Sequence, residues 1–256
     1  MDLVFYIAAG ASVGLAIGIT GIGGGSIMTP LLLAFGFPLH VAVGTDLLYA
    51  AVTKTGGVIA HARQKSIRWD LVILLALGSI PASAVTIYTL QSWFHSPENY
   101  TGIISLALGI TLILTSAVII FHSRLSYFAS KLAPLTSDKI YWLTPLMGLL
   151  LGVLVTLSSV GAGAIATALL MILYPTLKSL NIVGTDIAHA VPLTLFAGLG
   201  HLMLGNVDLY LLGALIAGSL PAVFLGARLA RHIPDRVLRP ILATTLFGAG
   251  VKVVFF

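Results

Sequence analysis

The chain has 256 residues, of which 58% are hydrophobic and 8% charged, with a net charge of +5 and a mean hydropathy of +1.08. Soluble domains carry about 25% charged residues, so this composition leaves too little polar surface for a water-facing globule. Apolar runs of about 20 residues recur along the whole length, which predicts an all-α polytopic membrane protein and excludes a barrel of short alternating strands. The absence of cysteine excludes disulfides and thiolate metal sites.

The hydropathy pattern predicts ten membrane segments. They cover residues 3–20, 25–36, 41–61, 70–91, 99–121, 140–157, 163–175, 182–204, 208–229 and 237–255. Segments 25–36 and 163–175 are short for a bilayer core that needs about 20 helical residues, and the sequence leaves open whether they cross fully or are re-entrant. The N-terminus carries Asp2 and no basic region, so we expect the first segment to be retained and not cleaved as a signal peptide.

The positions of the basic residues predict the orientation. Lysine and arginine gather in segments 62–69, 122–139 and 228–239 and at Lys178, whereas loops 92–98 and 205–208 contain neither. The positive-inside rule therefore predicts that the basic loops are cytoplasmic and that both termini lie outside the cell membrane. Because the basic residues sit mainly in these few short loops, with Lys54 inside a predicted span and Lys252 near the other face, we expect no nucleic-acid partner.

The sequence contains an internal repeat with an offset of 140 residues. The matching blocks are GIG 21–23 with GAG 161–163, VGTD 43–46 with VGTD 183–186, His61 with His201, and GSIPA 78–82 with GSLPA 218–222. Each copy contains five segments, an odd number, so the copies are predicted to be inverted in the membrane. We divide the chain into a first repeat at 1–122, a cytoplasmic linker at 123–139 and a second inverted repeat at 140–256. Inverted repeats with interrupted helices are typical of secondary transporters that bind substrate near the midplane.

Glycine-rich breaks interrupt both copies, GITGIGGGSIMTP at 18–30 and SSVGAGA at 158–164. Irregular backbone at membrane depth is tolerated only where protein or a water-filled cavity satisfies it. A helix that begins there directs N–H groups and a positive dipole end into the cavity, which favours a site for a small anion over glycines that serve packing alone. The predicted substrate-binding residues are Gly21, Gly23, Gly24, Gly25, Ser26, Lys54, Ser158, Ser159, Gly161 and Gly163.

Charged residues inside predicted spans are functional candidates, because burying a charge in a membrane is costly. Asp46 and Asp186 follow Gly-Thr in the two VGTD motifs. Three roles stay open for them: capping a helix together with Thr45 and Thr185, carrying a coupling proton, or binding a cation such as Na+. Lys54 lies two turns after Asp46, where it either neutralises an anionic substrate or forms a salt bridge with that aspartate.

Three histidines are further candidates. His61 and His201 end their predicted spans, where capping at the membrane interface is favoured over a role in transport. His189 lies one turn after Asp186 and is a possible proton relay or substrate donor, although its repeat counterpart is Tyr49.

No motif predicts a catalytic or metal centre, so we expect no enzyme activity, metal or cofactor. A weaker alternative is an intramembrane hydrolase that uses Ser26 or Ser159 with one of the histidines. Gly10, Gly14 and Gly18 form a small-residue ridge that packs either inside the chain or in a homodimer, so monomer and homodimer both stay open.

The stretch GITGIGGGSIMTPLLLAFGFPLHVAVGTDLLYAAVTKTGGVIAHARQKSIRW, followed by GSIPA and by a second GTD…H…GSLPA, resembles the TauE/SafE family of membrane transporters. This resemblance covers roughly 10–90 and 145–230, and it departs where Ala164 and Ile165 replace the last two glycines of the first break. The family is associated with export of sulfite and organosulfonates. The resemblance therefore implies an exporter of small sulfur-containing anions, with an anion channel of the same fold as the alternative.

Overall fold

The computed structural model describes five stretches of the chain, 3–20, 25–94, 97–132, 137–229 and 235–255. Three of the predicted binding residues, Gly21, Gly23 and Gly24, lie outside the described residues.

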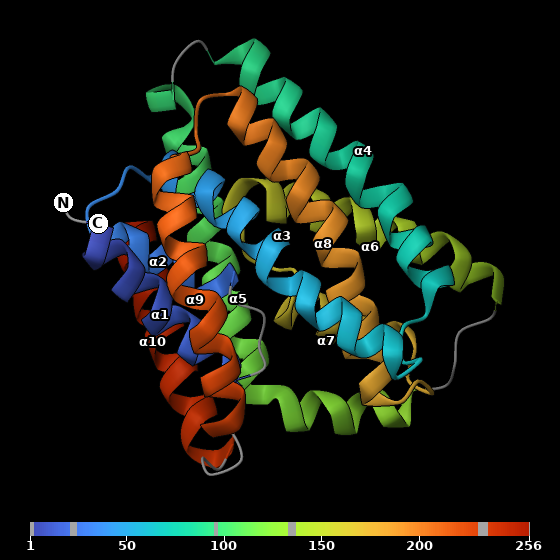
Figure 1. The fold of residues 1–256 in the computed structure, drawn as a ribbon. Helices are drawn as coiled ribbons and strands as arrows, with labels where there is room; N and C mark the ends of the chain where they lie inside the picture. The colour runs from blue at the N-terminus through green and yellow to red at the C-terminus, as the bar shows by residue number, and fades with distance from the viewer. Residues whose placement is uncertain (1–2, 21–24, 95–96, 133–136, 230–234, 256) are drawn as a thin grey trace.

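The described residues form ten helices (Figure 1). They are α1 Leu3–Thr20, α2 Gly25–Ala34, α3 Leu39–Arg63, α4 Trp69–Trp93, α5 Pro97–Lys131, α6 Ser137–Ser158, α7 Ala164–Leu173, α8 Ser179–Met203, α9 Leu209–Leu229 and α10 Asp235–Phe255. The predicted segments agree with these bounds to within three residues at most ends. The main exception is α5, which continues to Lys131 instead of ending at residue 121. Its additional turns are held by tertiary packing, because Ala129 is buried in a cluster with Met147 and Leu170.

The helix lengths confirm a polytopic membrane protein. Helices α4, α5, α6, α8 and α9 are each long and apolar enough to cross a bilayer. Helix α3 has 25 residues but is more polar, since Asp46 and Lys54 lie along it. Helices α2 and α7 have ten residues each, which at about 1.5 Å per residue span roughly half of a 30 Å hydrocarbon core.

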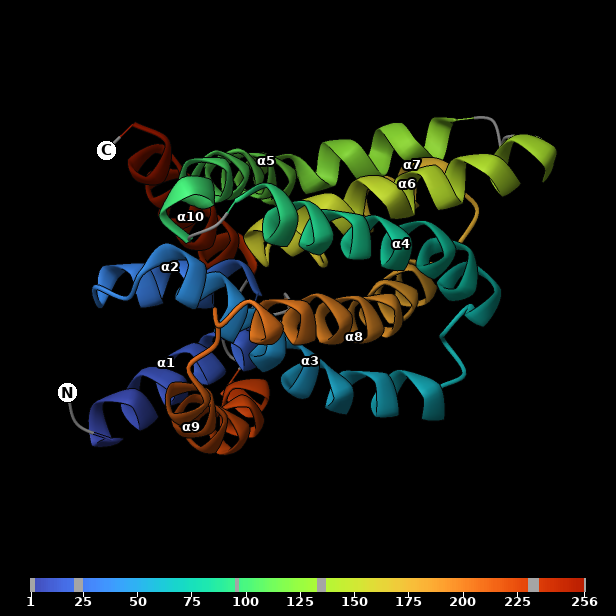
Figure 2. The same ribbon diagram turned by 90° about the horizontal axis from the view of Figure 1, so that it is seen from above.

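Helices α3 and α8, which carry the VGTD motifs, form the centre of the molecule. Helices α3 and α8 pack side by side, and Figure 2 shows α8 between α3 and α4. Around this pair, α4 packs on α6, α1 packs on α9, and α5 packs on α10. Helices α1 to α5 correspond in order to α6 to α10. When each helix is exchanged for its counterpart, the α1–α9 pair becomes the α6–α4 pair, and the α3–α8 and α5–α10 pairs stay the same. Two copies packed about a two-fold axis produce such an exchange.

Matching glycines bring the outer helix pairs into backbone contact. A Cβ atom added to Gly10 of α1 would lie 2.3 Å from the carbonyl oxygen of Leu215 on α9. A Cβ atom added to Gly148 of α6 would lie 2.2 Å from the carbonyl oxygen of Leu75 on α4. Only glycine permits this approach.

These contacts correct the alignment of the repeat. Gly10 and Gly148 are 138 residues apart, whereas their partners Leu215 and Leu75 are 140 apart. The single 140-residue offset is therefore wrong for the first helices of the copies, and a two-residue difference in length lies before α3 and α8. With the corrected offset, Gly23 corresponds to Gly161.

The ridge of small residues on α1 packs inside the chain. Gly14 lies against Ser219, and Gly226 of α9 lies against Gly18. Because α9 of the same chain covers the ridge, this face is not available to a second copy.

Replacing Gly218 of α9 by alanine should destabilise the protein, because the new Cβ atom would lie 2.0 Å from the carbonyl oxygen of Ile7. Overpacking of this kind costs about 1–3 kcal/mol, so we expect the melting temperature in detergent to fall by roughly 3–10 °C. The matched control is Gly213→Ala on the same helix, where no atom lies within 4 Å of the added Cβ. Equal melting temperatures for the two variants would contradict the close helix contact.

Candidate substrate site

The two VGTD motifs lie in the interior of the central helices. Asp46 is seven residues after the start of α3, Asp186 is seven residues after the start of α8, and both are buried. The residues that precede these helices are Pro38 and Lys178, and neither helix start has a side-chain cap. The interpretation that the aspartates cap their own helices is therefore wrong.

Each aspartate is hydrogen-bonded to the short helix of its own copy. Thr29 of α2 donates its hydroxyl to Oδ2 of Asp46 at 2.5 Å, and Thr167 of α7 donates to Oδ2 of Asp186 at 3.0 Å. The Oδ1 atom of each aspartate has no hydrogen-bond partner in the part of the chain that the structure describes. Sequence reasoning missed both threonines. The available signal was a threonine in the first turns of each short apolar segment.

The threonine of each motif binds the start of a helix in the other copy. Thr45 accepts a hydrogen bond from the backbone N–H of Asp208 at 3.2 Å, just before α9. Thr185 accepts one from the backbone N–H of Arg68 at 3.1 Å, just before α4. The two threonines therefore do bind helix starts, but across the copies and not at their own helices.

The glycine of each motif permits this crossing. A Cβ atom on Gly44 would lie 2.1 Å from the carbonyl oxygen of Asn206. A Cβ atom on Gly184 would lie 3.1 Å from the carbonyl oxygen of Ser66. In G-T-D, glycine thus allows close approach, threonine joins the copies, and aspartate holds the short helix.

Lys54 extends from α3 into the break of the second copy. Its ammonium nitrogen donates a hydrogen bond of 2.6 Å to the carbonyl oxygen of Ala162, and the side chain is 7% exposed. Among the described residues it forms no ion pair with Asp46, so the predicted salt bridge is absent. Lys54 nevertheless lies near both Asp46 and Asp186.

The break between α6 and α7 turns by left-handed backbone conformations. The φ angles are +58° at Ser159, +118° at Gly161 and +148° at Gly163, which directly precedes α7. A left-handed φ favours glycine, which explains the G-A-G pattern at this position. The turn presents the Ala162 carbonyl to Lys54 at the start of α7.

The three predicted serines differ in what their hydroxyls contact. The hydroxyl of Ser158 is used by the backbone, since it donates to the Leu154 carbonyl at 2.6 Å and accepts the Val160 N–H at 3.1 Å. The hydroxyl of Ser159 is buried, lies beside Asp46 and has no hydrogen-bond partner among the described residues. Ser26 is buried in the first turn of α2, which begins at Gly25.

The two histidines at the helix ends hold the turns that follow them. His61 Nδ1 lies 2.8 Å from the Ser66 hydroxyl. Asn206 donates its amide to His201 Nδ1 at 3.1 Å, so His201 Nε2 carries the proton that is donated to the Thr156 carbonyl at 2.9 Å. Both histidines thus contact a residue of the turn that follows their helix, and His201 is fully buried.

His189 contacts a serine that the sequence did not indicate. Its Nε2 atom lies 2.8 Å from the hydroxyl of Ser79 on α4, and both side chains are buried. The described contacts of His61, His189 and His201 include neither Ser26 nor Ser159, so the serine–histidine pairs of the hydrolase alternative do not form.

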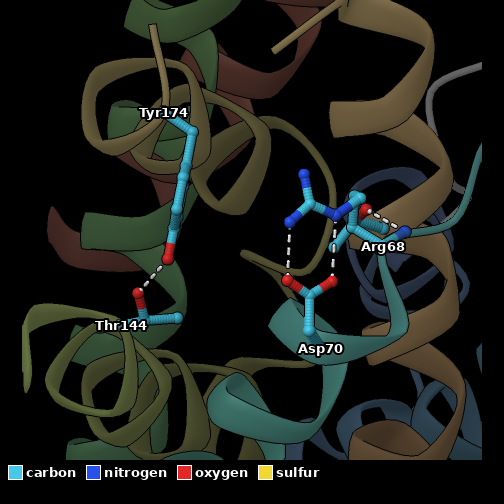
Figure 3. Close-up of polar contacts among 5 residues, drawn as sticks. Arg68, Asp70, Thr144 and Tyr174 are labelled. Carbon is cyan, nitrogen blue, oxygen red and sulfur yellow. Dashed lines mark hydrogen bonds and ion pairs between the residues drawn. The ribbon is translucent and has the colours of Figure 1, made fainter. Parts of the chain in front are cut away.

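The basic α3–α4 turn carries an ion pair beside the end of α7 (Figure 3). Arg68 donates to both carboxylate oxygens of Asp70, at 3.0 Å and 2.6 Å, and this hydrogen bonding raises the pKa of Arg68. Nearby, the hydroxyls of Tyr174 and Thr144 are hydrogen-bonded, which fastens the end of α7 to α6. Arg68 and Asp70 are about half exposed, so the pair contributes little stability.

The helices and the buried polar cluster define a multi-pass membrane protein with a charged site at the junction of its two copies. The chain belongs to the sulfite exporter TauE/SafE family, whose pattern matches residues 6–253. It is accordingly a membrane transporter.

Curated relatives agree with this assignment. A probable membrane transporter protein YjnA of Bacillus subtilis is 38% identical over 255 residues, which cover 98% of this chain and 99% of the relative. A probable membrane transporter protein YdhB of the same organism is 27% identical, with 94% and 96% covered. The probable membrane transporter protein MJ0441 of Methanocaldococcus jannaschii is 28% identical, with 82% and 75% covered. No solved structure matches the chain significantly.

Replacing Thr45 or Thr185 by valine should loosen the junction between the copies, because each change removes the acceptor of a backbone N–H. Loss of one such hydrogen bond costs about 1–2 kcal/mol, so we expect melting temperatures to fall by roughly 2–6 °C. The control is Thr55→Val, since the exposed Thr55 bonds only to the Ala51 carbonyl of its own helix among the described residues. Equal melting temperatures for all three variants would show that the junction does not depend on these bonds.

Proposed function

We propose that the protein is a secondary transporter that exports small sulfur-containing anions, such as sulfite or organosulfonates, by alternating access. The observation that carries this proposal is the buried ammonium of Lys54, held at the Ala162 carbonyl at the start of α7. The description of the family as a sulfite exporter supports the substrate class.

The chemistry around Lys54 suits a small oxyanion. Hydrogen bonds between an ammonium and an anionic oxygen are about twice as strong as neutral ones. The N-terminus of α7 adds a partial positive charge beside the lysine. The free hydroxyl of Ser159 supplies a further donor at the same place. Sulfite and sulfonate groups present three oxygens, which these donors can share.

The inverted-repeat arrangement supplies a mechanism. The exchange of helix pairs between the copies supports two inverted repeats. In Figure 1 the α3–α4 turn, the start of α8 and the end of α5 lie at the lower edge, while the α8–α9 turn lies at the upper edge. This arrangement supports our assignment of the basic segments to the cytoplasmic side. We propose that one copy rocks against the other about the α3–α8 pair, so that the site opens to each side in turn.

Anion binding should raise the melting temperature of the purified protein, because a ligand that binds only the folded state stabilises it by mass action. At about one hundred times Kd the stabilisation is near 2.7 kcal/mol, which corresponds to roughly 5–10 °C. The probes are sulfite, sulfate, thiosulfate, taurine and sulfoacetate. We expect at least one to produce the shift, and Lys54→Met to abolish it.

The matched control is Lys252→Met, which removes an exposed lysine and should keep the shift. Circular dichroism checks that Lys54→Met remains folded. The ligand found is then tested in proteoliposomes, where saturating flux indicates a carrier and linear flux a channel. Absence of a shift and of flux with every sulfur oxyanion would contradict the proposed substrate class.

A further inference from the structure

The buried charges of the site do not balance. In the part of the chain that the structure describes, Asp46, Asp186 and Lys54 are all less than 10% exposed. Two carboxylates and one ammonium leave one negative charge without a compensating group. An uncompensated buried charge is unfavourable in a membrane protein, so a second negative charge brought in by an anion favours the uptake of a cation or a proton.

Other titratable groups around the site do not supply the missing positive charge. Tyr49 lies on α3 near Asp46 and carries no positive charge. His189 on α8 lies beside Lys54, whose charge opposes a second positive charge there. The groups nearest Asp46 on α2 and on the α6–α7 turn are the hydroxyls of Thr29 and Ser159.

The two aspartates differ in one neighbour, because Asp46 lies beside the hydroxyl of Ser159. The Oδ2 atom of Asp46 accepts the Thr29 hydroxyl, but its Oδ1 atom has no partner among the described residues. The neighbouring hydroxyl of Ser159 is also unused within the described residues and can accept a hydrogen bond from a protonated carboxyl.

We propose that Asp46 takes up one proton when an anion binds at Lys54, so that the anion and the proton occupy the site together. Hydronium transfers the proton to Oδ1 of Asp46, which becomes a neutral carboxylic acid, and one water molecule is released. This inference rests on the proposed function and specifies its coupling ion.

The physical cause is the competition for Lys54. A bound anion engages the ammonium that otherwise compensates the carboxylates, which leaves both aspartates exposed to uncompensated negative charge. Protonation of Asp46 removes one of these charges. Anion binding and protonation therefore strengthen one another, and by linkage the effect is reciprocal.

The test measures anion affinity against pH with methanesulfonate, a strong-acid anion that does not itself titrate near neutral pH. If one proton is taken up per anion, Kd should rise about tenfold for each unit of pH between about pH 7 and 9. In Asp46→Asn the carboxyl is replaced by a neutral amide of the same shape, so Kd should not change with pH. The control Asp208→Asn should keep the tenfold dependence, since this residue lies at the start of α9 and its Oδ1 accepts the Leu211 N–H.

Calorimetry of the unmodified protein in two buffers of different ionisation enthalpy provides a second measurement that does not need any variant to fold. We expect about one proton per methanesulfonate near pH 8. Binding without proton uptake and with a Kd independent of pH would overturn the inference and leave the proposed function intact. A dependence retained in Asp46→Asn would overturn the assignment to Asp46. No methanesulfonate binding at any pH would count against the sulfonate substrate class and this inference together.

Discussion

The carbonyl of Ala162 and the ammonium of Lys54 form the contact on which the site depends. A charged side chain within a membrane protein needs partners supplied by the protein itself. Here the partner is a buried backbone carbonyl that lies in the break between α6 and α7. The carbonyl gives the buried ammonium a hydrogen-bond acceptor, and the ammonium gives the carbonyl a donor. The glycine-rich interruption in an apolar chain is therefore explained by the charge that it accommodates.

The central helices connect this contact to the rest of the fold. Through the VGTD motifs, α3 and α8 hold the short helices α2 and α7 by their aspartates and the starts of α9 and α4 by their threonines. A change in the charge of an aspartate thus acts directly on a short helix. The threonine of the same motif is bonded to the other copy. Each motif therefore contacts both a short helix and the other copy within three consecutive residues.

The two copies share a fold but not a chemistry. Lys54 reaches the break of the second copy, whereas its counterpart Thr194 bonds to the Ala190 carbonyl within its own helix. His189 contacts Ser79, while its counterpart Tyr49 lies beside Ser219 on the equivalent helix. Corresponding positions of the two copies make matching packing contacts, but they do not carry matching ionisable residues. A symmetric scaffold consequently holds an asymmetric cluster of buried charges.

The sequence by itself determined the membrane class, the helix positions, the repeat and the identity of the charged residues, because hydropathy, motif spacing and charge are local properties of the chain. Only the tertiary structure decided which groups these residues meet. Thr45 and Asp208 are 163 positions apart, and Lys54 and Ala162 are 108 apart, so no local pattern joins them. The same reason explains the length of α5, whose last turns depend on the burial of Ala129 against Met147 and Leu170. It also explains the 138-residue offset of the first helices, which becomes visible only where Gly10 and Gly148 meet their partners across the molecule.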